Sequence, residues 1–427
     1  MLGSLAPLFG VLLGAGLSAL IAQAPATRPI SRWQPPGHQD RGLPKPDAVW
    51  SPYDEGPQHP ANRVFAAIWL ARLQPAEVAA ALPTEHSGAS KFFTNGWYFK
   101  KRDGRDGDER WFGGDGLQLP RERFTAAESA ALIDLLLAID GELAANLRSR
   151  PQSCIWLQND LLRTARRLLD TDANSELLLP LLRAAERLAL PAATLEDASL
   201  STFGLESLTA VEPALAHGRL VELDRRSSRL FDAEHSLLWS RVFVQWPETA
   251  EPDLQGYLEA AANKLQPSIP LQTRAVLIQG LVAIDDQGRP RATSIAIDVR
   301  LQIFANADPL SVANTTTTHD GIAFRAFWLE RQTLRERGAN LKLSDFRELA
   351  DEDQVLFRDY GSLKHTTVAA QCSLCHRRTD TPEQDLAGFP VLRRTSEPKS
   401  HIAADTRLRR AEAEFERFLV ALRSAVK

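Results

Sequence analysis

The spacing of apolar residues changes near residue 215 of this chain of 427 residues, and that change limits the folds open to it. Between residues 62 and 190, apolar residues recur at the intervals of amphipathic helices, as in RVFAAIWLARL and IWLQNDLLRTARRLL. After about residue 215 the pattern alternates and is rich in β-branched and aromatic residues, as in LWSRVFVQW and ATSIAIDVRLQIFA. The two periods predict a multidomain α+β protein, with helices first and strands after them.

Local sequence patterns predict the positions of several helices and turns. Thr125 and Glu128 form a capping box at the start of the helical stretch TAAESAALIDLLLAIDGELAANL. Cys154 opens the next helix and is expected to be a small buried apolar residue. DQGRPR separates two strand patterns and predicts a hairpin turn. The stretch DLQGYLEAAANKL predicts a helix between strands.

Other stretches predict loops and a terminal helix. Lys100–Gly116 is charged and Gly-rich, and the spacing of its aspartates does not match an EF-hand, so a solvated loop is expected. Thr315–Gly321 is expected to be a polar loop. From Ser344 the pattern turns helical again, and it ends in a helix whose apolar stripe comprises Leu408, Ala411, Phe415, Phe418 and Leu422.

The first 26 residues carry no charged side chain and have an apolar centre. Small residues at Ala22–Ala24 or Ala24–Ala26 have signal-cleavage spacing, so residues 1–26 predict a signal peptide and export to the periplasm or another extracytoplasmic site. An uncleaved anchor is the alternative, because the apolar run approaches the ~17–25 residues that span a bilayer. Membrane association is expected only in that case.

The net charge and the positions of Pro and Gly complete the predicted organisation of the chain. The net charge of −4 gives no support for nucleic-acid binding. Residues 27–61 are rich in Pro and Gly and predict an extended lead-in. A mainly helical region over 62–214 and a β-rich or α+β domain over 215–335 are expected to follow.

The stretch CSLCH at Cys372–His376 carries the most specific chemistry. In a C-x-x-C-H pattern, both thiols can form thioethers with the vinyl groups of one haem, and the adjacent histidine can bind its iron. Cys372 and Cys375 are therefore the predicted tethers of one covalent haem c, with His376 as the proximal ligand. Export agrees with this prediction, since such haem is attached outside the cytoplasm.

This segment resembles the attachment site of mono-haem c-type cytochromes. The resemblance implies a small all-α, cytochrome c-like domain over 344–427, with the motif near its first helix and a C-terminal helix packed across it. One-electron transfer with a redox partner protein is the function it implies. The resemblance covers only the last fifth of the chain, and residues 62–335 resemble no family.

The distal iron ligand predicted for this chain differs from that of many members of the family. Many such cytochromes use a methionine there, but the only methionine of this chain is Met1. His401 is the main candidate for the distal ligand, because the Pro-containing stretch before it is long enough to reach the opposite haem face. His365, His319, a histidine from the N-terminal region and an open position are the alternatives. Two histidines would give a low-potential carrier, whereas an open position would bind peroxide, NO or CO.

Other functions fit the residues less well. A haem enzyme or gas or peroxide sensor with an open iron site is one alternative, and an interaction protein with a structural haem is another. A thiol–disulfide oxidoreductase would use the same C-x-x-C, but no thioredoxin-like βαβ order surrounds it. A zinc site lacks a second ligand pair. No linear motif of a catalytic site occurs in residues 62–335, so no catalytic residue is assigned.

Overall fold

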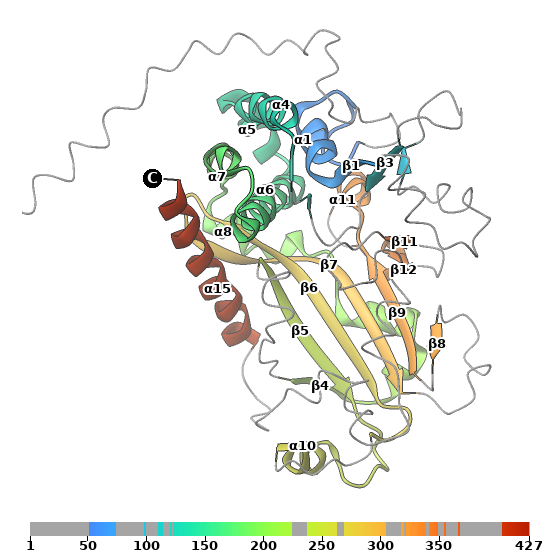
Figure 1. The fold of residues 1–427 in the computed structure, drawn as a ribbon. Helices are drawn as coiled ribbons and strands as arrows, with labels where there is room; N and C mark the ends of the chain where they lie inside the picture. Colours follow the sequence, from blue (N-terminus) through green and yellow to red (C-terminus); the bar gives the residue numbers. More distant parts are fainter. Residues whose placement is uncertain are drawn as a thin grey trace, which may run out of the picture. The chain divides into compact units, whose positions relative to one another are not determined.

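The computed structural model describes residues 51–73, 98–99, 110–113, 120–121, 123–223, 237–262, 269–304, 317–319, 322–338, 341–348, 354–355, 366–367 and 404–426. All of them belong to one compact unit, which spans Arg41–Lys427. Its elements are helices from the first half of the chain, an antiparallel sheet from the second half, and a terminal helix (Figure 1). The protein therefore combines helices with an antiparallel sheet.

The helices of the first half gather around α6, the longest of them. Pro151 lies in the first turn of α6, where its missing N–H costs no hydrogen bond, and Asp172 ends the helix in a left-handed conformation with φ 49°. The predicted capping box of Thr125 and Glu128 is confirmed at the start of α4. The helices are α1 (Pro60–Trp69), α4 (Ala126–Leu137), α5 (Gly141–Arg148), α6 (Pro151–Thr171), α7 (Leu178–Arg187) and α8 (Ala192–Leu195).

Short 3-10 turns connect these helices to the sheet. They are η2 (Ala198–Leu200), η3 (Leu205–Ala210) and η4 (Pro213–His217), whereas η1 (Ser175–Leu177) lies between α6 and α7. Thr202 Oγ1 donates to the carbonyl oxygen of Ala296 at 2.7 Å, and Gln245 Nε2 donates to that of Ala214 at 3.2 Å. These bonds hold the connecting segment against the strands.

The main sheet has seven strands in the order β10-β9-β7-β6-β5-β4, with β8 pairing β9. Every pairing in it is antiparallel. Helix α10 (Leu254–Ala262) lies between β5 and β6 in the chain, and α11 (Arg331–Arg337) and η6 (Leu343–Asp345) lie between β9 and β10. The strands are β4 (Leu220–Leu223), β5 (Leu238–Gln245), β6 (Arg274–Ile284), β7 (Pro290–Phe304), β8 (Thr317–His319), β9 (Ile322–Trp328) and β10 (Arg347–Glu348).

The predicted hairpin is confirmed between β6 and β7, where Ile284 faces Pro290. Asp285 organises its turn. Its Oδ1 accepts from the backbone N–H groups of Gln287 and Arg289 at 2.9 Å, and its Oδ2 accepts from Arg289 Nε and Arg291 Nε at 3.1 Å. Burial tends to raise the pKa of Asp285, but these hydrogen bonds outweigh it and hold the pKa below the usual value.

A glycine is required further along the same hairpin. The register of β6 against β7 shifts at Gly280. A Cβ on Gly280 would lie 2.1 Å from Trp239 Cζ2 and 2.4 Å from the carbonyl oxygen of Ile295. The Trp239 ring is fixed there because its Nε1 donates to the carbonyl oxygen of Thr293 at 2.7 Å. Only a residue without a side chain allows this close packing.

The central part of helix α6 is buried on all sides and joins the helical layer to the sheet. Every residue from Ser153 to Ala165 is buried, and one apolar core contains side chains of α6, the sheet and the terminal helix. Polar residues of α6 bond directly to the strands. Asn159 Nδ2 donates to the carbonyl oxygens of Leu237 and Val282 at 2.9 and 2.8 Å. Gln158 Oε1 accepts from the backbone N–H of Ile284 at 2.8 Å.

The terminal helix α15 (Ala404–Ala425) lies along the sheet (Figure 1). The predicted apolar stripe is confirmed for Ala411, Phe415, Phe418 and Leu422, all of which are buried, whereas the side chain of Leu408 lies outside the described residues. Their neighbours in the core come from α6 and from the strands β5 to β7. The described part of the chain's C-terminus therefore shares the main core.

Several predicted elements are wrong. The first helix ends at Trp69, and Leu70–Leu73 form strand β1 instead of continuing it. Strand β1 pairs with β3 (Arg110–Gly113), which also pairs with β2 (Tyr98–Phe99), so part of the expected loop is a strand. Aromatic residues such as Trp111 and Phe112 favour strands, and pairing supplies their backbone hydrogen bonds.

Two later predictions are also wrong in part. Thr317–His319 form β8 and pair with β9, so this part of the expected polar loop is a strand. After Ser344, where helix was expected, Arg347–Glu348 form β10 at the edge of the main sheet. Two further short strands, β11 (Gln354–Val355) and β12 (Thr366–Thr367), pair with each other. Pairing with a neighbouring strand overrides the local preference for loop or helix at these residues. The division into separate domains stays a prediction.

Candidate functional site

The residues predicted to attach haem lie outside the described residues. This holds for Cys372, Cys375, His376 and His401, and also for the predicted signal peptide. The described elements nearest to the motif in the chain are β12, which ends at Thr367, and α15, which begins at Ala404. The haem-attachment site therefore remains a prediction from the sequence.

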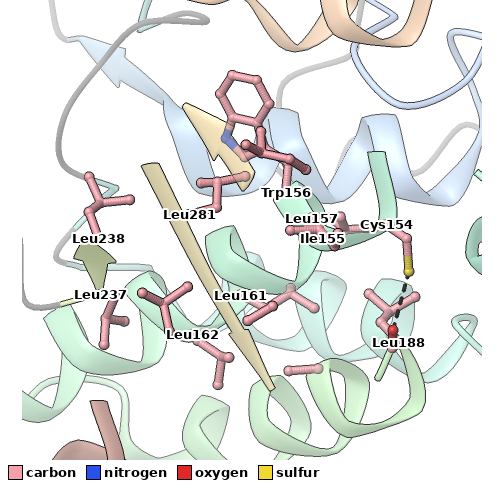
Figure 2. Close-up of a cluster of buried hydrophobic side chains, with 14 of the residues drawn as sticks. Cys154, Ile155, Trp156, Leu157, Leu161, Leu162, Leu188, Leu237, Leu238 and Leu281 are labelled. Carbon is pink, nitrogen blue, oxygen red and sulfur yellow. Dashed lines mark hydrogen bonds between the residues drawn. The ribbon is translucent and has the colours of Figure 1, made fainter. Parts of the chain in front are cut away.

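The third cysteine is described. Cys154 is fully buried in α6, among the apolar side chains drawn in Figure 2. Its Sγ donates to the carbonyl oxygen of Leu188 at 3.2 Å. Burial raises the pKa of this thiol to about 12, so it stays protonated and unreactive at neutral pH. The prediction of a small buried residue is confirmed.

Two histidine side chains fall within the described residues. His59 Nδ1 accepts a hydrogen bond from the backbone N–H of Ala61 at 3.2 Å, so the neutral ring carries its proton on Nε2. That Nε2 lies 3.8 Å from Asp54 Oδ2. His59 therefore has no free lone pair for iron in this arrangement. Its pKa is lowered, because burial disfavours the charged ring more than Asp54 favours it. His217 is exposed at the end of η4.

The most unusual polar site of the described residues is a buried ion pair between α6 and α11. Arg331 Nη2 and Nε donate to Asp160 Oδ1 and Oδ2 at 2.7 and 2.9 Å. Tyr53 Oη donates to Asp160 Oδ2 and accepts from Arg331 Nε at 2.9 Å. All three side chains are at most 3% exposed. The site joins three segments that are far apart in the sequence.

Aromatic rings surround the guanidinium of this pair. The Cζ atom of Arg331 lies 4.6 Å from the ring centre of Trp156, 4.8 Å from that of Trp69 and 5.3 Å from that of Phe65. A guanidinium presents flat faces that stack on aromatic rings while its edge bonds to a carboxylate. The rings thus hold Arg331 in the orientation that the bidentate bond to Asp160 needs.

More charged groups lie next to this pair. Arg163 of α6 lies 5.5 Å from the ring centre of Trp69 and experiences the charges of Asp160, Arg331 and Asp298. Burial lowers the pKa of Arg163 to about 10, which still leaves it charged at neutral pH. On β7, Arg300 Nη2 and Nε donate to Asp298 Oδ2 at 2.6 and 2.9 Å. The charged cluster thus extends from α6 to the sheet.

This cluster is suited to holding elements together. Both oxygens of Asp160 accept hydrogen bonds from Arg331, and Oδ2 accepts another from Tyr53, so the carboxylate is committed as an acceptor. The sequence does not reveal this cluster, because its members are separated by up to 278 residues. The signal that was present is the run Gln158–Asp160, three polar residues inside a helix whose neighbours are apolar. Such a run predicts buried partners once the helix is known to be central.

The described residues hold no group of three or more His, Cys, Asp or Glu side chains arranged to bind a metal ion. Within the same residues, no helix is long and apolar enough to cross a membrane. Searches against protein-family models, curated proteins and solved structures give no match to this chain.

Proposed function

We propose that this protein is an exported c-type cytochrome that carries one covalent haem and transfers single electrons. The observation that carries the proposal is the Cys372–His376 sequence CSLCH. Its donor set fits haem c, with two thiols for the thioether bonds and one imidazole for the iron. When bound, such a haem supplies a one-electron carrier. The apolar N-terminal segment supports the proposal, because it is typical of exported chains.

The state of Cys154 is consistent with this assignment. Among the three cysteines of the chain, Cys154 is buried and has a raised pKa. Cys154 also has no second cysteine and no histidine within five residues, so it lacks the attachment pattern. Cys372 and Cys375 are therefore the cysteines assigned to the haem, and a redox partner protein is the proposed partner.

The attachment is tested by a haem stain on the denatured chain after expression in a host that attaches haem. The wild-type chain should stain, and the stain should be lost in Cys372→Ala plus Cys375→Ala. The matched control is Cys154→Ala, which removes the third thiol and should keep the stain. An unstained wild-type chain would refute the proposal.

A second candidate function is a haem enzyme or gas or peroxide sensor. It is favoured by one observation, the absence of any methionine beyond Met1, which removes the usual distal ligand. His401 is the residue proposed to fill that position in an electron carrier. A low-spin ferric spectrum that turns high-spin in His401→Ala would support the carrier. CO binding to the ferrous wild-type protein would instead support the open site. An interaction protein with a structural haem is the remaining alternative.

A further inference from the structure

The packing of the terminal helix bears on how the proposed haem would be held. An independent C-terminal haem domain of residues 344–427 would need the apolar stripe of its last helix for its own core. In the structure, Phe415, Leu419 and Leu422 are 0% exposed within the main core. The stripe is therefore already occupied by the body of the protein, which here means residues 51–348 as far as they are described.

Polar contacts fix the middle and the C-terminal end of the same helix to the β6–β7 hairpin. Glu412 Oε1 accepts from the backbone N–H of Ala292 at 2.8 Å. Near the C-terminal end, Arg423 Nη2 donates to the carbonyl oxygen of Gly288 at 3.1 Å and lies 3.6 Å from Glu186 of α7. A helix with a buried stripe and polar contacts at two separate points has one defined position on the body.

The chain is also anchored before the motif. Strand β10 pairs with β9, and Glu348 accepts from Arg325 Nε and Nη2 at 2.6 and 2.8 Å. The same Arg325 donates to the carbonyl oxygen of Val211 at 2.7 Å. Residues 349–403, which include the CSLCH motif, are thus joined at both ends to elements of the body.

We propose that this protein has no separable haem domain, and that the haem-bearing segment folds together with the body through α15. The inference rests on the proposed function. Without α15, the predicted haem domain would keep about 60 residues, a length at which an independent core is marginal. The haem environment and the body should therefore unfold in one transition.

The test compares two thermal unfolding curves of the full-length holoprotein. The Soret absorbance of the ferric haem follows the haem environment, and far-UV circular dichroism follows the body. We expect coincident midpoints in the wild type. In Phe415→Ala both midpoints should fall together by several degrees, because a fully buried ring is lost. Phe415→Leu is the milder variant if Phe415→Ala does not fold, and a smaller joint fall is expected.

The matched control is Val420→Ala on the same helix, since Val420 is 55% exposed. Neither midpoint should change by more than about a degree. A Soret midpoint that stays in place while the circular dichroism midpoint falls would overturn the inference. A chain that carries no haem would refute the proposed function itself, and the haem stain shows this before any unfolding experiment.

Discussion

Asp160 and Asp170 lie on the same helix, α6, and each accepts an arginine N–H at 2.7 Å. Their surroundings differ completely. Asp160 and Arg331 have side chains that are 1% and 3% exposed, whereas those of Asp170 and Arg166 are 34% and 29% exposed. Water can replace the partner of Asp170 but not that of Asp160. Burial, and not distance, therefore decides how much each pair matters to the fold.

The largest effect is expected for Asp160→Ala. The substitution leaves the buried guanidinium of Arg331 without its carboxylate. A loss of about 3–5 kcal/mol in the free energy of unfolding is expected, as for other broken buried pairs. Urea denaturation followed by tryptophan fluorescence measures it. A loss below about 1 kcal/mol would show that the pair is hydrated in solution and would remove the contrast with Asp170.

A smaller effect is expected for Tyr53→Phe. The ring stays, including its edge-to-face contact with Phe65, but the hydroxyl that bonds to Asp160 and Arg331 is removed. Hydrogen bonds to charged groups contribute about 1.5–3 kcal/mol. The same denaturation experiment should show a loss of that size. A double substitution with Asp160→Ala should lose less than the sum of the two, because the residues share one network.

Asp285 extends the comparison to a buried carboxylate in a turn. Asp285→Asn should lower the free energy of unfolding by about 1 kcal/mol at neutral pH, since a charged acceptor becomes a neutral one. The folded-state pKa of Asp285 is lowered, so the carboxylate stabilises the fold above its unfolded pKa of about 3.9. This contribution is lost as the pH falls through the folded pKa.

The measurement is the difference in melting temperature between the wild type and Asp285→Asn at several pH values. The difference should be constant between pH 7 and 5 and should shrink below about pH 4. A difference that grows on acidification would mean that the pKa is raised in the folded state, contrary to the hydrogen bonds described above.

The smallest effect is expected for Asp170→Asn. The pair with Arg166 is exposed and four residues apart on the helix, a geometry that contributes about 0.3–0.5 kcal/mol. The change in the free energy of unfolding should stay within that range and should vanish in 1 M salt. An effect as large as that of Tyr53→Phe would contradict the statement that an exposed ion pair on α6 contributes much less than a buried one.

The same contrast explains what the sequence could predict. The capping box of Thr125 and the hairpin at Asp285 depend on neighbours within a few residues, so local patterns predict them. The ion pair of Asp160 with Arg331 joins residues 171 apart, and no local pattern contains that information. The strand β3 was missed for a similar reason, because one of its two pairing partners lies far away in the chain at Leu70–Leu73.

In the candidate haem site, the attachment residues can be predicted from the sequence, but the distal ligand cannot. CSLCH can be predicted because thioether formation requires a fixed spacing of two thiols and one imidazole within five residues. The distal ligand cannot be predicted in this way, because the residue that faces the iron is chosen by tertiary packing. The structure argues against one candidate for the distal ligand, His59. Both of its ring nitrogens already face polar groups.

The burial of Cys154 makes its thiol a built-in probe of how often the helical layer opens. Its protonated thiol is inert while α6 is packed, so an added alkylating reagent can modify it only when the surrounding core opens. In the proposed holoprotein the other two cysteines are blocked by thioether bonds. The rate at which one equivalent of label enters would then report how often the centre of the molecule becomes accessible, without any engineered probe.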